Sequence, residues 1–184
     1  PEILALQRLG RPTHSRTVGP EGRRIGVFGG TFDPPHVGHL VTAVNVRHSL
    51  VLDEVLLVVA NQPWQKVGTR TISPSVDRLA MVEAAVRGVD GLEASAIEVD
   101  RGGASYTADT LRELQEREPD AERPGSEPAA VPEGWSCTHV EVPRLEVSST
   151  ELRDRAADGR PLDFLLAPAV ISCIRDRQLY RDRT

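Results

Sequence analysis

The feature that most constrains the fold is the apolar run at residues 54–60 (EVLLVVA), in which only the first residue is charged. A strand without polar alternation is typical of a parallel sheet that is covered on both faces. A second short apolar run, residues 24–28 (RIGVF), ends directly before two glycines and predicts another buried strand. Two such strands separated by a helical pattern favour an α/β fold.

The other elements are predicted from periodicity and from Gly, Pro and Ser punctuation. We expect strands at residues 92–99 and 138–142, and helices at 38–50, 74–87 (capped by Ser73), 107–118, 149–159 and 168–176. Strands that alternate with helices predict a Rossmann-like, doubly wound, mainly parallel sheet with C-terminal helices. Such sheets bind ligands at the carboxyl ends of their strands.

The ends of the chain and one internal segment differ from this pattern. Residues 1–22 offer at most a helical turn or two at 3–9, so we expect an N-terminal extension without a catalytic role. Residues 23–184 are expected to form a single domain. Residues 119–134 are rich in Pro, Glu, Ala and Gly and predict a surface loop or a mobile segment.

Composition excludes several classes of function. The net charge is −5 and only 4% of residues are aromatic, which argues against nucleic acid as a partner. We expect no membrane association, because no apolar run could span a bilayer and the N-terminus does not resemble a secretion signal. Two cysteines are too few for a disulfide framework, so a cytoplasmic location is expected.

Residues 29–40 (GGTFDPPHVGHL) follow the first predicted strand and lead into a helix. Glycines let the backbone approach a ligand, and the amides of a helix N-terminus favour an anion, so this arrangement predicts a phosphate site. His36 and His39 are three residues apart and can share one helix face. Two imidazole donors directed at one phosphorus would stabilise charge that develops in a transition state.

Other interpretations of this run are weaker. It matches neither the Walker A loop nor the G-x-G-x-x-G fingerprint. A tight turn with two surface histidines would explain an isolated His-x-x-His, but not the whole run. A metal site would need a third ligand at a sensible spacing, and none is evident.

The run resembles a signature of the nucleotidylyltransferase superfamily, with residues 36–39 (HVGH) as its (T/H)xGH motif. Residues 147–153 (VSSTELR) resemble the second signature, I-S-S-T-x-x-R, with Val147 in place of isoleucine. Residues 62–66 (QPWQK) and 105–111 (SYTADTL) are similar to segments of bacterial nicotinate mononucleotide adenylyltransferases, as is the C-terminal part. Several motifs in the expected order make the resemblance specific.

The resemblance implies that AMP is transferred from ATP to nicotinate mononucleotide, with release of pyrophosphate and with Mg²⁺ bound together with ATP. It implies that His36 and His39 hold the ATP phosphates, His39 at the transferred α-phosphate. Lys66 would bind phosphate and Arg153 would hold the leaving pyrophosphate. Further ATP-binding positions are Gly29, Gly30, Thr31, Phe32, Ser148, Ser149 and Thr150, and acceptor-binding positions are Trp64, Tyr106 and Thr107. No side chain is predicted to be a metal ligand. The sequence is compatible with a homo-oligomer.

Several of these residues also have plain structural explanations. Lys66 could be a solvated loop residue, Trp64 could be loop packing, and Asp33 could close the turn before Pro34. Ser148, Ser149 and Thr107 could be ordinary helix caps.

The chain departs from the family pattern after residue 118. The family has a strand with a G-x-D motif and then a helix there, but Glu122 is followed at once by Arg123-Pro124-Gly125. We therefore expect a family segment to be absent at the junction 122/123, either as a true deletion or because the printed chain omits it. Two alternatives to the main function remain: a non-catalytic ATP-binding module without an acceptor site, or a related enzyme such as a phosphopantetheine adenylyltransferase.

Overall fold

The computed structural model of the protein describes residues 4–5, 24–62, 72–117 and 140–181. Trp64, Lys66, the segment 119–134 and the junction 122/123 lie outside the described residues.

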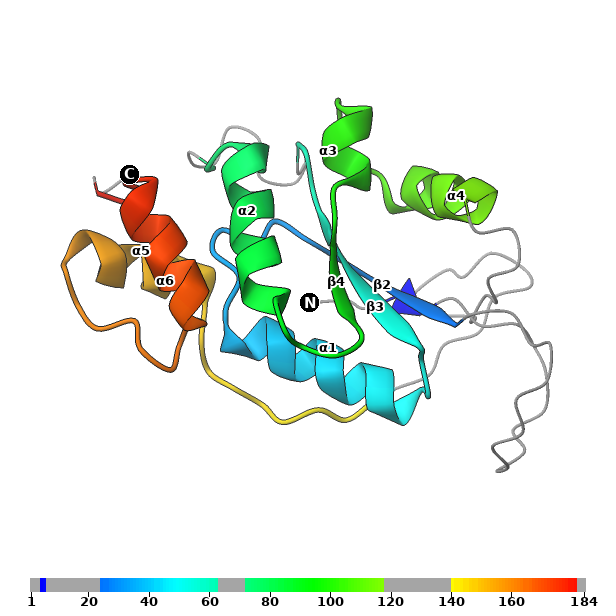
Figure 1. Cartoon of the computed structure of the whole chain (residues 1–184), viewed down its shortest axis with the longest axis horizontal. Helices are drawn as coiled ribbons and strands as arrows, with labels where there is room; N and C mark the ends of the chain where they lie inside the picture. Colours follow the sequence, from blue (N-terminus) through cyan, green and yellow to red (C-terminus); the bar gives the residue numbers. More distant parts are fainter. Residues whose placement is uncertain (1–3, 6–23, 63–71, 118–139, 182–184) are drawn as a thin grey trace.

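The described chain is built on a four-stranded sheet with the order β1-β2-β3-β4 (Figure 1). β2 (Ile25–Gly30), β3 (Glu54–Val59) and β4 (Leu92–Ser95) are parallel neighbours. β1 (Leu4–Ala5) pairs antiparallel with β2, with Leu4 opposite Val27 and Ala5 opposite Gly26. The predicted mainly parallel sheet is confirmed, and the apolar run of β3 lies at its centre with every residue but one buried.

Both faces of the sheet are covered, as the uninterrupted apolar strands require. Side chains of α1 (Val37–Ser49) and α2 (Ser75–Val86) pack against one face, where Phe28, Val55 and Leu57 are buried. α3 (Ile97–Arg101) and α4 (Thr107–Arg117) cover the opposite face through Ile97 and Leu114, which meet Val27 and Val58.

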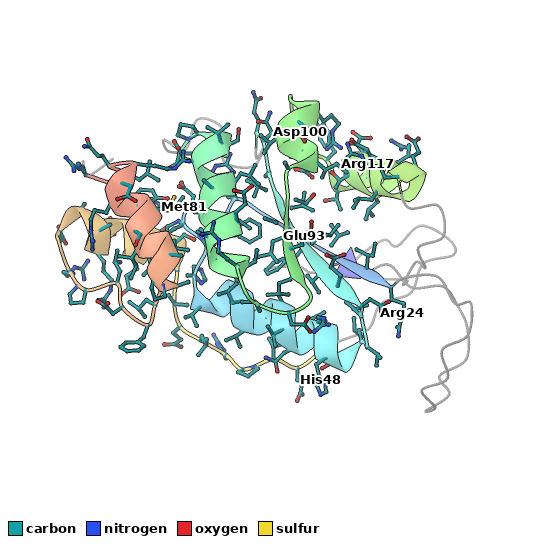
Figure 2. All side chains as sticks on the ribbon, in the orientation of Figure 1. Arg24, His48, Met81, Glu93, Asp100 and Arg117 are labelled. Carbon is teal, nitrogen blue, oxygen red and sulfur yellow. The ribbon has the colours of Figure 1, made fainter. Side chains whose placement is uncertain are left out.

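α5 (Ser149–Ala157) and α6 (Pro168–Asp176) form a separate layer beside α2, away from the sheet (Figure 1). A second apolar cluster joins this layer to α2 through Met81, Leu152 and Val170. Met81 lies between α2 and α6 in Figure 2. The layer brings the start of α5 close to the start of α1, where the predicted site lies.

Four local predictions were wrong. β4 ends at Ser95, because the chain turns at Ala96 into the short helix α3, so the predicted strand 92–99 is only half its length. Residues 140–142, the described part of the predicted strand 138–142, are not a strand. Leu4 and Ala5, expected in a helical turn, add a strand to β2.

The fourth wrong prediction concerns the start of α2. Pro74 is the N-cap rather than the first helical residue, and no side chain caps the helix. The backbone of Ser73 is engaged elsewhere, since its N–H donates to Asp33 and its carbonyl accepts from Arg78.

Gly30 is required by the packing of its own turn. A Cβ at this position would lie 2.7 Å from the ring of Phe32, which is buried at 2% exposure. We expect Gly30→Ala to lower the free energy of unfolding by about 1–3 kcal/mol, because the ring cannot yield without disturbing the core. Urea denaturation of the purified variant measures this change.

Gly29 provides the matched control for this prediction. Nothing lies within 4 Å of the position where its Cβ would be. Gly29→Ala should therefore change the free energy of unfolding by less than about 0.5 kcal/mol. Equal losses in the two variants would contradict this account of the turn.

Candidate active site

The candidate site lies where β2 ends and α1 begins. The backbone leaves the sheet at Gly30, passes through the buried residues Phe32 and Asp33, and enters α1 after His36. His36 is the N-cap, with extended dihedral angles (φ −137°, ψ 171°). Gly29 is exposed with open space beside it, so the backbone there is accessible to a ligand. This is the carboxyl end of a parallel strand, as predicted.

The two histidine rings lie against each other at this point. Their centroids are 3.7 Å apart and their planes differ by 33°. The ring of His39 also packs against Phe32, at a centroid distance of 5.1 Å. The sequence prediction that both rings share one face is therefore confirmed.

The hydrogen bond made by His39 fixes its tautomer. The backbone N–H of His36 donates to Nδ1 of His39 over 3.0 Å. Nδ1 must therefore carry a lone pair, so the proton of the neutral ring is on Nε2. Nε2 is therefore the ring nitrogen of His39 that carries a hydrogen-bond donor.

His36 is held in a different environment. Its Nδ1 is buried and has no hydrogen-bond partner among the described residues. Desolvation lowers the pKa of His36 from 6.5 to about 4, so the ring is neutral at pH 7. Gly38 leaves room for this ring, because a Cβ there would lie 3.1 Å from both the ring and Val147.

This lowered pKa predicts how stability depends on pH. Between pH 6.5 and 4 the unfolded chain binds a proton at His36 that the folded protein does not, so stability is lost as the pH falls through this window. Because water reaches part of the ring, we expect the loss to be about 1–2 kcal/mol. Urea denaturation at several pH values measures it, and the loss should be absent in His36→Asn. Parallel curves for the two proteins would contradict the prediction.

The second motif meets the first at the start of α5. Ser149 Oγ donates to the carbonyl of Pro34 over 2.9 Å, and Nη1 of Arg153 donates to the carbonyl of Asp33 over 2.7 Å. Ser148 caps the helix by accepting from the N–H of Glu151. The two motifs are more than 100 residues apart in the chain, and their juxtaposition builds one site.

The remaining predicted residues are placed as follows. Thr150 is exposed and accepts a hydrogen bond from Nη2 of Arg153. Tyr106 and Thr107 are exposed at the start of α4. Ser105, next to Tyr106, bonds to the backbone of Asn61 and Gln62 after β3, so this segment lies at the same edge of the sheet. The side chain of Phe32 is in the core, so only its backbone is available to a ligand.

Sequence reasoning missed Arg78 as part of the framework of the site. It is 1% exposed and donates to four backbone carbonyls, at distances of 2.6–3.0 Å. These acceptors are Thr31 after β2, Ala60 and Asn61 after β3, and Ser73 before α2. Arg78 thus fixes the strand ends around the site. The sequence feature that could have indicated this role is the position of a charged residue beside the apolar stripe of α2. A charge at such a buried position is costly unless it is hydrogen-bonded.

The sequence suggested for Asp33 only that it closes the turn before Pro34, but the structure gives it more partners. Its carboxylate is buried at 1% exposure, and its carbonyl holds Arg153. No pattern in the sequence predicts these partners, which come from distant elements.

Within the described residues, no group of three His, Cys, Asp or Glu side chains is arranged to hold a metal ion. The helices of the described part include none that is long and apolar enough to cross a membrane.

The fold and the candidate site together define a class: an α/β protein whose helix N-terminus, at the end of a parallel strand, is suited to bind the phosphates of a nucleotide. A family model described as cytidylyltransferase-like matches residues 27–155. A protein of Corynebacterium kroppenstedtii named "Probable nicotinate-nucleotide adenylyltransferase" is 38% identical over 192 residues, covering 85% of this chain and 90% of its own. A Streptomyces coelicolor protein of the same name is 38% identical over 188 residues, covering 84% and 99%.

Solved structures agree on the fold. Nicotinic acid mononucleotide adenylyltransferase of Plasmodium falciparum, complexed with NaAD, superimposes with a TM-score of 0.63 at 15% identity, covering 85% of this chain and 97% of that one. The chain belongs to the nicotinate-nucleotide adenylyltransferase family, within the cytidylyltransferase-like proteins.

The alignment with the Corynebacterium protein is longer than the part of this chain that it covers. About 156 residues, which is 85% of the 184 in this chain, occupy 192 aligned positions, so about 36 positions have no counterpart here.

Proposed function

We propose that the protein transfers the adenylyl group of ATP to nicotinate mononucleotide, producing nicotinate adenine dinucleotide and pyrophosphate. The observation that carries the proposal is that Arg153 of α5 is bonded to the loop that leads into the two adjacent histidines at the start of α1. The chain is also 38% identical to a relative named as a probable nicotinate-nucleotide adenylyltransferase. A phosphate oxygen of the acceptor attacks the α-phosphorus, and the bond to the bridging oxygen of pyrophosphate breaks. Such transfers depend on positioning and charge stabilisation rather than on a covalent intermediate.

His39 contributes the Nε2–H donor to the α-phosphate. Because its other nitrogen accepts the His36 N–H, the ring is aligned before the substrate binds. His36 is neutral at pH 7, and its ring, which lies against that of His39, is assigned to the ATP phosphates as well. The exposed backbone at Gly29 allows close approach of the phosphate chain, together with the backbone of Gly30, Thr31 and Phe32.

Arg153 binds the leaving pyrophosphate through its planar guanidinium, which matches phosphate oxygens. Its Nη1 is already bonded to the carbonyl of Asp33, so the group lies against the loop that leads into α1 and its two histidines. Ser148, Ser149 and Thr150 support the same end of the substrate, and Lys66 adds a point charge. Mg²⁺ enters as part of the MgATP substrate, where it neutralises phosphate charge.

The acceptor is assigned to the side of the site formed by Tyr106 and Thr107, with Trp64. The exposed phenol of Tyr106 at the start of α4 and the link of Ser105 to the end of β3 support this assignment. Soluble mononucleotides are the partners proposed here, and the cytoplasm is the proposed location.

The absence of a family segment at the junction 122/123 is part of the proposal. The gap positions, about 36 in the alignment with the Corynebacterium protein, support it. We expect mass spectrometry to find a peptide that joins Glu122 directly to Arg123. A peptide with additional residues between them would show that the molecule contains the segment.

The same gap favours a second candidate function, a module that binds ATP without an acceptor. Pyrophosphate release decides between the two, measured with MgATP and nicotinate mononucleotide, nicotinamide mononucleotide or phosphopantetheine. The main proposal expects turnover that is fastest with nicotinate mononucleotide. Calorimetric ATP binding without turnover on any acceptor would favour the module, and turnover fastest with phosphopantetheine would identify a different enzyme.

A further inference from the structure

We propose that Tyr180, near the end of the described chain, is a positioning residue for the reaction: its phenol holds Asp33 so that the carbonyl of Asp33 keeps Arg153 in place. The inference rests on the proposed function, since it concerns how Arg153 reaches the leaving pyrophosphate.

The contact joins two parts of the chain that are 147 residues apart. The hydroxyl of Tyr180 donates to Oδ1 of Asp33 over 2.7 Å. Oδ2 of the same carboxylate accepts from the N–H of Ser73 over 3.4 Å. The sulfur of Met81 lies 3.7 Å from the hydroxyl, so the phenol is enclosed by α2. Asp33 thus connects the loop after β2, the start of α2 and the C-terminal part of the chain.

The Asp33 carboxylate needs this donor. It is 1% exposed, and a buried carboxylate is tolerated only when its oxygens are hydrogen-bonded. Tyr180 remains a donor at every working pH, because burial and the neighbouring Asp33 charge raise the pKa of its phenol above the ordinary value of 10.

The backbone around the contact shows that it is held in place. Phe32 (φ +50°), directly before Asp33, and Tyr180 (φ +60°) both adopt left-handed conformations that non-glycine residues rarely take. Such conformations persist where surrounding contacts determine them. The carbonyl that accepts from Arg153 belongs to Asp33 itself, at 2.7 Å, so a rotation of this residue moves the guanidinium.

The test is Tyr180→Phe, which keeps the ring and removes the donor. The control is Val170→Ala in α6. Val170 is fully buried in the apolar cluster against which Tyr180 packs, and its side chain has no polar group that could bond Asp33 or Arg153. For each protein we would measure the free energy of unfolding, kcat, KM for ATP and the calorimetric Kd for pyrophosphate with Mg²⁺. Asp33→Asn and the double variant complete a cycle for the contact.

For Tyr180→Phe we expect kcat to fall about tenfold while KM for ATP stays within about twofold, and the Kd for pyrophosphate to rise about fivefold. The reason is that a displaced Arg153 would bind the leaving pyrophosphate less well, both in the transition state and as the product. Val170→Ala should lose at least as much free energy of unfolding as Tyr180→Phe, while its folded fraction keeps the wild-type kcat and pyrophosphate Kd. Adding Tyr180→Phe to Asp33→Asn should lower kcat by less than about twofold.

Unchanged kcat and pyrophosphate Kd in Tyr180→Phe would overturn the inference, and so would equal losses in Val170→Ala. If the wild-type protein shows no turnover, the proposed function fails, and the pyrophosphate Kd values still decide whether Tyr180 positions Arg153.

Discussion

Replacing His39 with alanine is expected to lower kcat for pyrophosphate release by about 10²–10³-fold, the usual effect of removing a donor that stabilises transition-state charge. The ring is aligned by the His36 N–H and by packing on Phe32, so its Nε2–H is in position before chemistry begins. Since the donor acts mainly in the transition state, KM for ATP should change much less than kcat.

His48 supplies the matched control. It is an exposed histidine at the opposite end of α1 (Figure 2). His48→Ala should keep kcat within about twofold, because surface residues away from the site have small effects. A His39→Ala protein that is folded and retains more than a tenth of wild-type kcat would contradict the role given to this ring.

Replacing Arg153 with lysine is expected to lower kcat by about 10²-fold, although the positive charge is kept. The guanidinium of Arg153 bonds the Asp33 carbonyl and the Thr150 hydroxyl and still has N–H donors for pyrophosphate. The ammonium group of lysine is a single point charge and cannot make all of these contacts at once. KM for the acceptor should be nearly unchanged, because Arg153 is assigned to the leaving group.

Arg155 is the control on the same helix. Its Nε pairs with Glu151 at 3.0 Å and its Nη1 donates to the carbonyl of Pro161, so its guanidinium is engaged with α5 and the segment after it. Arg155→Lys should keep wild-type kcat and lose little stability, as partly exposed ion pairs contribute little. If both arginine variants lose activity equally, Arg153 acts through the stability of α5 and not through the substrate.

The sequence predicts the layout of the fold because apolar patterning determines burial. The apolar runs at 24–28 and 54–60 became β2 and β3, and the stripe of Met81, Val82 and Ala85 became the buried face of α2. Proline and serine signals placed the starts of α6 and α5 correctly. The resemblance to known signatures then located the site, and the structure brought its two motifs together.

The errors occurred where local pattern is ambiguous. The run 92–99 is apolar enough for a strand, but from Ile97 its residues pack equally well as the short helix α3. Leu4 and Ala5 form a strand only because the edge of β2 offers backbone partners, which no local window can contain.

The support of the site could not be predicted for the same reason. Arg78 and Asp33 act through hydrogen bonds to backbone groups and side chains that lie 5 to 147 residues away, most of them on other elements. Such contacts depend on the completed fold, since periodicity specifies which residues are buried but not which polar groups they meet.

The central claim is that the adenylyl group, and not another part of ATP, moves to nicotinate mononucleotide. It is tested most directly by a reaction with ATP labelled on the α-phosphate and, in parallel, on the γ-phosphate. We predict that the α-label appears in a dinucleotide with the mass of nicotinate adenine dinucleotide, while the γ-label appears in pyrophosphate. An α-label that stays in ATP, or that appears in free AMP without any dinucleotide, would contradict the account.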